Sequence, residues 1–196
     1  RRYGMTVLGG TVPMRSPKIN KVCNSLLVYG PDGRRLARYD KIHLFGFQRG
    51  DESYDESVAI HPGRTPVVAD VPVDGALLRV GLSVCYDLRF PELYRQMAPL
   101  DLMVMPAAFT YTTGQAHWEL LLRARAVEGQ CYVLASGQGG THPSGRRTWG
   151  HSMLVDPWGE VCAVLPEGEG VVMAEMDTER LASVRESLPA LRHRVL

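Results

Sequence analysis

Cys85 is the residue whose type and position most directly suggest chemistry. An apolar run at residues 77–84, typical of a buried strand, ends at this cysteine. Pro91 and Glu92 then favour a helix start, because proline fits the first helical position and a carboxylate complements the helix dipole. Free N–H groups near a helix start lower the pKa of a thiol and can hold an oxyanion. A nucleophilic cysteine and a buried structural cysteine both fit this placement between strand and helix.

Lys41 is a charged residue among β-prone neighbours near a predicted strand end. Residues 23–29 and 34–39 are typical of two strands, and the Gly-Pro-Asp-Gly sequence at 30–33 joins them as a hairpin. On residue type alone, Lys41 is predicted to be a surface lysine paired with Asp40.

Phe109 follows a buried strand predicted at residues 100–105. Ligand-contacting loops of α/β sheets tend to follow the carboxyl ends of strands, so Phe109 is a candidate pocket wall, although core packing fits equally well. The arginines around Arg146 and Arg192 form short clusters that we expect to be solvated.

The remaining pattern predicts an alternation of strands and helices, which favours an α/β fold. Strands are expected at residues 5–12, 66–73, 76–84, 131–136 and 170–176, with a further pair around a turn at 156–159. Helices are expected at 91–98 and 115–130, and a third capped by Thr178 and ending near 187. Residues 46–57 and the glycine-rich 137–145 are expected to form loops.

The size and composition fit one ordinary domain over residues 1–196, with 45% hydrophobic and 22% charged residues. A net charge of +1 does not indicate binding to nucleic acid or to an acidic membrane surface. The four cysteines show no C-x-x-C pair, so neither a zinc site nor a disulfide framework is expected, and no cofactor is predicted. Reduced thiols and the lack of a membrane-length apolar run favour a cytoplasmic location.

Residues 84–92, Val-Cys-Tyr-Asp-Leu-Arg-Phe-Pro-Glu, resemble the nucleophile segment of the nitrilase superfamily. These carbon-nitrogen hydrolases cleave amides and nitriles through a cysteine thioester. Residues 38–45, 116–128 and 150–161, around Lys41, Trp118 and Trp158, are similar to three other segments of the superfamily. The resemblance implies an α/β fold, a four-layer αββα sandwich of two mixed sheets with helices outside, usually paired as a homodimer.

The resemblance also implies a mechanism. Cys85 attacks the amide carbon, while Lys41 and the backbone N–H of Tyr86 hold the oxyanion. Glu56 matches the position of an auxiliary glutamate that orients the lysine and the substrate, with Glu52 as a competitor in a loosely aligned loop.

The general-base glutamate implied by the resemblance is not in this chain. In the superfamily it lies on a strand-and-helix region upstream of the position of Arg1, so we expect this sequence to be incomplete at its N-terminus and clipped at its C-terminus. A fragment of this kind is expected to be inactive by itself.

Within the superfamily, the sequences of residues 128–133 and 149–153 are most similar to those of the Nit group. That group hydrolyses ω-amides of 2-oxo acids, and one branch acts on deaminated glutathione. The expected partner is therefore a small-molecule amide, with 2-oxoglutaramate or an N-carbamoyl compound as alternatives. A papain-like thiol hydrolase would need a histidine in a matching local signature, which none of the six histidines has. A non-catalytic scaffold with this fold is the other alternative, and the missing glutamate favours it.

Overall fold

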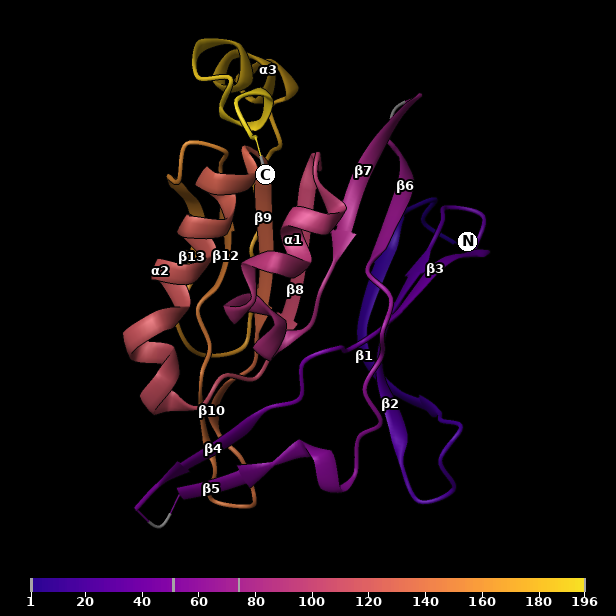
Figure 1. The fold of residues 1–196 in the computed structure, drawn as a ribbon, viewed down its shortest axis with the longest axis vertical. Coiled ribbons are helices and arrows are strands. Elements are labelled where there is room, and N and C mark those ends of the chain that lie inside the picture. The colour runs from indigo at the N-terminus through magenta and orange to yellow at the C-terminus, as the bar shows by residue number, and fades with distance from the viewer. Residues whose placement is uncertain (1, 51, 74, 196) are drawn as a thin grey trace.

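The computed structural model describes residues 2–50, 52–73 and 75–195. Its main element is a six-stranded sheet in the order β13-β12-β9-β8-β7-β6 (Figure 1). The neighbours β7, β8 and β9 are parallel and the other pairs antiparallel, so the sheet is mixed. Its strands are β6 Val67–Val73, β7 Ala76–Leu82, β8 Leu102–Ala107, β9 Tyr132–Gly137, β12 Ser152–Val155 and β13 Val161–Leu165.

A three-stranded antiparallel sheet packs against the six-stranded one. It contains β1 Val7–Arg15, β2 Val22–Tyr29 and β3 Arg35–Asp40. Leu26, Val28 and Tyr39 of this sheet share one core cluster with Val80 and Leu82 of the larger sheet. Burial of such apolar side chains from both sheets holds the two layers together.

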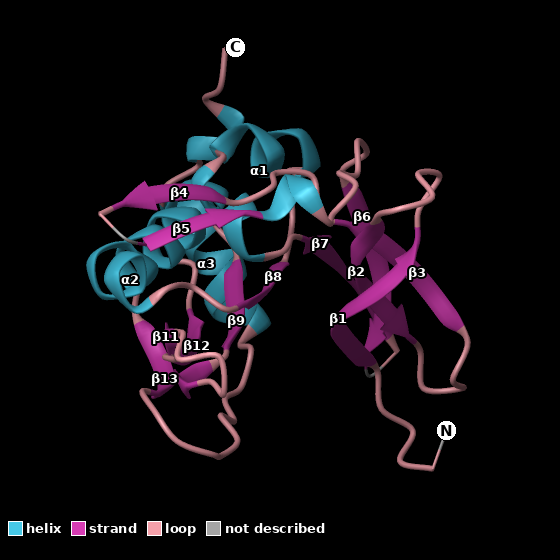
Figure 2. Cartoon of the chain, turned by 90° about the horizontal axis from the view of Figure 1, so that it is seen from below, coloured by secondary structure: helices cyan, strands magenta, loops and turns pink. Residues whose placement is uncertain are grey.

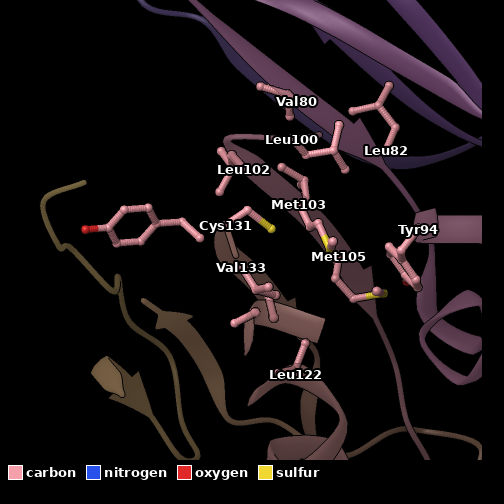
Figure 3. Packing of buried hydrophobic residues seen from close by; sticks show 14 of the residues in the cluster. Val80, Leu82, Tyr94, Leu100, Leu102, Met103, Met105, Leu122, Cys131 and Val133 are labelled. Atoms are coloured by element: carbon pink, nitrogen blue, oxygen red, sulfur yellow. The ribbon is translucent and has the colours of Figure 1, made fainter. Parts of the chain in front are cut away.

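Two helices, α1 Pro91–Met97 and α2 Tyr111–Gly129, pack on the side of the six-stranded sheet away from β1–β3, as Figures 1 and 2 show. The third, α3 Thr178–Ser187, lies beyond the upper end of β9 in Figure 1. Trp118, Leu122 and Ala126 recur at a four-residue spacing on α2 and are buried, which gives this helix its sheet-facing stripe. Figure 3 shows Leu122 close to Val133 of β9, with Met103 and Met105 of β8 further from it in the same cluster. None of the described helices has the length and apolar character needed to cross a membrane.

Two short hairpins lie apart from the main sheets. One pairs β4 Gly46–Arg49 with β5 Glu52–Asp55, and the other pairs β10 Gly139–Thr141 with β11 Arg147–Trp149. In Figure 1 β4, β5 and β10 lie below the lower ends of β8 and β9. Three 3₁₀ helices complete the fold: η1 Glu56–Val58, η2 Cys85–Arg89 and η3 Ala190–Arg192.

The α/β class, the β6–β7 hairpin and the helix after Cys85 are confirmed. The strand predicted at residues 170–176 is wrong, because this stretch has no regular structure. The two segments predicted as loops instead supply β4, β5 and β10. Asp177, rather than Thr178, caps α3 by accepting hydrogen bonds from the backbone of residues 179 and 180. The long helix begins four residues earlier than predicted because Thr110 caps it.

Candidate active site

Cys85 lies at a sharp turn between strand and helix, as predicted. β7 ends at Leu82, Val84 is still extended, and η2 begins at Cys85. Cys85 has a φ of +53°, in the left-handed region that residues with a side chain rarely adopt. Such strain persists only where the surrounding structure imposes it, and it often marks a functional site.

Asp87 supplies the contacts that hold this turn. Its carboxylate is fully buried, and Oδ2 accepts hydrogen bonds from the Val84 N–H at 2.9 Å and from the Tyr39 hydroxyl at 2.7 Å. Oδ1 accepts from the His43 N–H at 3.0 Å and lies 2.7 Å from Nδ1 of the same histidine. Asp87 therefore connects the cysteine turn to the segment that follows β3. The only indication in the sequence was an acidic residue two positions after the cysteine.

The neighbours of Asp87 are themselves fixed. The His43 ring stacks on Phe90 with centroids 3.7 Å apart and planes 6° from parallel. Burial raises the pKa of the Tyr39 hydroxyl, and the charge of Asp87 raises it further, so this hydroxyl stays protonated and donates. The segment at residues 39–43 is thus held at both sides of Lys41.

Lys41 has a fully buried side chain, which rules out the surface role predicted from residue type alone. Its ammonium forms an ion pair with Oε2 of Glu56, and the same oxygen accepts a hydrogen bond from the Phe45 N–H at 2.8 Å. Asp40 pairs with Arg38 instead, at 2.8 Å. A buried ammonium needs such a partner, since an isolated charge is expensive to desolvate.

The structure brings Glu56 to the lysine, as the resemblance implied. Glu56 begins η1, directly after Asp55, whose side chain accepts a hydrogen bond from the Ser57 N–H at 2.8 Å. The competing Glu52 lies on β5, three residues before Asp55, and its side chain falls outside the described residues.

A cavity of about 460 Å³ collects these groups. Phe109 lines it and also packs on Trp118, with ring centroids 4.8 Å apart, so this side chain lies between the cavity and the core. Arg146 lines the cavity as well, which corrects the expectation that it is solvated. The predicted site residues in the cavity wall are Lys41, Glu56, Cys85, Tyr86 and Phe109.

The electrostatics of the cavity act on the thiol in both directions. Burial raises the pKa of Cys85, and the Glu56 carboxylate raises it as well. The Lys41 ammonium, a backbone hydrogen bond from Ala108 and the Arg146 guanidinium each lower it. Burial dominates, so the pKa of the thiol lies above its ordinary value and the nucleophile must give up a proton to react. No group of three or more His, Cys, Asp or Glu among the described side chains is arranged to hold a metal ion.

A sequence profile described as carbon-nitrogen hydrolase matches residues 1–186. The chain belongs to the carbon-nitrogen hydrolase family. Deaminated glutathione amidase from Yersinia enterocolitica is 42% identical over 200 residues, which cover 98% of this chain and 68% of that protein. Omega-amidase NIT2 from Homo sapiens is 40% identical over 191 residues, covering 96% of this chain and 67% of that protein.

The crystal structure of the C. elegans NitFhit protein is similar over the whole chain, with a TM-score of 0.89 and 39% identity, and 48% of that protein is covered. The resemblance to Nit-type members of the nitrilase superfamily and the predicted fold are therefore confirmed. The chain spans about two thirds of the length of the two curated relatives.

Proposed function

We propose that this carbon-nitrogen hydrolase cleaves a linear amide through a thioester on Cys85. The observation that carries the proposal is the joint placement of Cys85 and the fully buried ammonium of Lys41 in the wall of one cavity. A desolvated cation beside a strained cysteine turn suits acyl transfer, because negative charge develops on the carbonyl oxygen in the transition state.

The reaction proceeds in two steps, formation of the thioester and its hydrolysis. The Cys85 sulfur attacks the amide carbon, and Lys41 Nζ together with the Tyr86 backbone N–H stabilises the oxyanion. The C–N bond then breaks, and the nitrogen takes a proton and leaves as ammonia. Water attacks the thioester, which gives the free carboxylic acid and restores the thiol.

Glu56 orients Lys41 in this scheme. Its Oε2 atom already accepts from the ammonium and from the Phe45 backbone, so this oxygen is committed to holding the cation. The proton acceptor for the thiol is a separate group, which we assign to the glutamate that the family resemblance implies outside this chain. A thiol whose pKa is raised by burial requires such an acceptor near neutral pH.

The proposed substrate is an ω-amide of a 2-oxo acid, with deaminated glutathione foremost. Two kinds of relative support this, since one is named for deaminated glutathione and the other is an omega-amidase. 2-Oxoglutaramate is the main alternative. We also propose a cytoplasmic homodimer as its working form, in line with the family resemblance and with four cysteines that form no disulfide bond.

Intact-mass measurement of the full-length protein, mixed rapidly with deaminated glutathione, tests the mechanism. The expected result is a transient acyl adduct with release of ammonia, absent from Cys85→Ala and retained in Cys162→Ala, whose thiol is exposed. If no candidate amide gives an adduct or releases ammonia, the proposal is wrong and a non-catalytic scaffold is favoured.

A further inference from the structure

Arg146 has an unused hydrogen-bond donor in the wall of the active-site cavity. Its Nη2 donates to the Ala108 carbonyl at 2.7 Å, and its guanidinium lies over the Tyr54 ring, 5.0 Å from the centroid. Its Nε is buried and has no hydrogen-bond partner among the described residues. A buried, unpaired N–H of a cation is costly unless a ligand satisfies it.

The hairpin that carries Arg146 is fastened in place. The Arg146 carbonyl accepts from the His142 N–H at 2.9 Å, and His142 Nε2 lies 2.8 Å from the Thr148 hydroxyl. Thr148 also forms an isolated β-bridge with Thr110, the residue that caps α2. The guanidinium is therefore preorganised, which reduces the entropy lost when it binds a ligand.

The charges around the cavity favour an anion. The described residues that line the cavity include three cations and two carboxylates: Lys41, Arg89, Arg146, Asp55 and Glu56. Glu56 is paired with Lys41, and Asp55 caps η1. The excess positive charge thus belongs to the two arginines.

Arg89 is the weaker candidate of the two. Both of its Nη atoms lie 3.3 Å from Nδ1 of His117, and its guanidinium lies 5.5 Å from the centroid of the Phe109 ring. Arg146 is the arginine whose buried donor lacks a partner.

We infer that Arg146 binds a carboxylate of the substrate, at the end remote from the amide that Cys85 attacks. Arginine suits this role because its planar fork of N–H donors matches a carboxylate. The inference rests on the proposed amidase function and deepens it: the site selects amides that carry an anionic group, and Arg146 is the residue that makes the selection.

The kinetic test compares glutaramate with its methyl ester, which keeps the amide and loses the charge. We would measure kcat/KM for ammonia release by the full-length protein and take the ratio of the two amides. Arg146→Met should lower this ratio about 10- to 100-fold, the usual effect of losing a charge-assisted hydrogen bond. Any change in Cys85 reactivity affects both amides and cancels in the ratio.

Arg147→Met is the matched control. Arg147 is adjacent in sequence, but it is exposed, pairs with Glu167 at 3.1 Å and stacks on Tyr111. The control should leave the ratio unchanged. If Arg146→Met lowers kcat/KM equally for both amides, so that their ratio is unchanged, the inference is wrong and Arg146 has a structural role.

A binding measurement separates this inference from the proposed function. Glutaramate binding to Cys85→Ala protein, followed by calorimetry, needs no turnover. Adding Arg146→Met should weaken binding by a similar 10- to 100-fold, roughly the same loss as in the kinetic ratio. If binding depends on Arg146 while no amide is hydrolysed, the amidase proposal fails and the carboxylate site stands. An unchanged Kd would overturn the carboxylate site even if amides are hydrolysed.

Discussion

The part of the cavity wall that holds Cys85 and Lys41 is fastened by buried hydrogen bonds, whereas another part comes from two hairpins outside the main sheets. In the first part, the Asp87 carboxylate accepts from three different residues and is fully buried. In the second part, β4–β5 and β10–β11 are separate two-stranded sheets that carry Tyr54 and Arg146. The β10–β11 hairpin is held by contacts such as the bridge between Thr148 and Thr110, and not by a buried carboxylate.

This difference corresponds to a division of labour. Oxyanion stabilisation requires groups held in place before the reaction, and the proposed catalytic pair follows β3 and β7, one strand from each of the two packed sheets. Selection of a substrate can be carried by loops on that rigid base, where sequence changes cost little stability. Changes on the core side should therefore reduce rate and stability, and changes on the hairpin side should alter selectivity.

The largest effect is expected for Lys41→Met. Methionine keeps much of the side-chain length but removes the cation, so the oxyanion loses a preorganised partner. We expect kcat for amide hydrolysis to fall by about 10²- to 10³-fold, as for other oxyanion-hole deletions. Steady-state ammonia release measures this, and Lys18→Met, at an exposed lysine, is the control. A loss confined to KM would show that Lys41 only binds substrate.

Asp87→Asn should reduce both stability and rate. The amide nitrogen of asparagine must face at least one group that donates in the wild type, so buried hydrogen bonds are lost. We expect the free energy of unfolding to drop by about 2–4 kcal/mol. Because Asp87 positions residues on either side of Cys85 and Lys41, kcat should fall while KM changes little.

Urea denaturation and steady-state kinetics would measure the two effects of Asp87→Asn. Asp70→Asn is the matched control, because the Asp70 side chain is exposed on β6. Full stability together with a wild-type kcat would show that Asp87 does not position the catalytic pair.

The sequence could locate the candidate groups in the cavity wall but not the residues that hold them. The family resemblance of local segments singled out Lys41 and Glu56, and for Cys85 the strand-to-helix pattern pointed the same way. The contacts of Asp87 with Tyr39 and His43 cross 48 and 44 positions of the chain, so no local pattern encodes them. Arg146 similarly reaches the cavity only through the folding of a hairpin that looked like a flexible glycine-rich loop.

The incorrect prediction of a strand at residues 170–176 also arises because a local pattern does not show which contacts the fold provides. Val171 and Met173 alternate with other residues as in a strand, yet each is 84% exposed. Alternation favours a strand only where a neighbouring strand and a core are available to receive it. No described strand pairs with this stretch, and it contacts the core at Met176, near its end.

The thiol of Cys85, half-buried in the cavity wall, should show the pH dependence of a desolvated group. Burial raises its pKa, so the thiolate fraction is small at pH 7. This fraction keeps increasing at pH values above those at which an ordinary cysteine titrates. The rate of alkylation by iodoacetamide should thus still rise above about pH 9. Because the folded state favours the protonated thiol, its contribution to stability is present below the ordinary thiol pKa and lost as the pH rises through the folded value.

Mass spectrometry of the alkylated protein measures this profile, with Cys85→Ala as the background. Lys41→Met should move the profile to higher pH, because the Lys41 ammonium lowers the pKa of the thiol. A rate that is already constant at pH 7 would contradict the dominance of burial and indicate a stable thiolate.

The smallest effect on stability is expected for His142→Ala, on the hairpin side. This change removes the contact between His142 Nε2 and the Thr148 hydroxyl and loosens the turn that presents Arg146. The free energy of unfolding should change by no more than about 1 kcal/mol, since one hydrogen bond at the edge of a surface hairpin is lost. The preference for glutaramate over its methyl ester should nevertheless fall roughly threefold, because the guanidinium is less well preorganised. Ser144→Ala, at an exposed position of the same turn, should change neither quantity. If His142→Ala instead destabilised the protein as much as Asp87→Asn, the hairpin would have to be counted as part of the core, and the proposed division between rigid chemistry and adjustable selection would not hold.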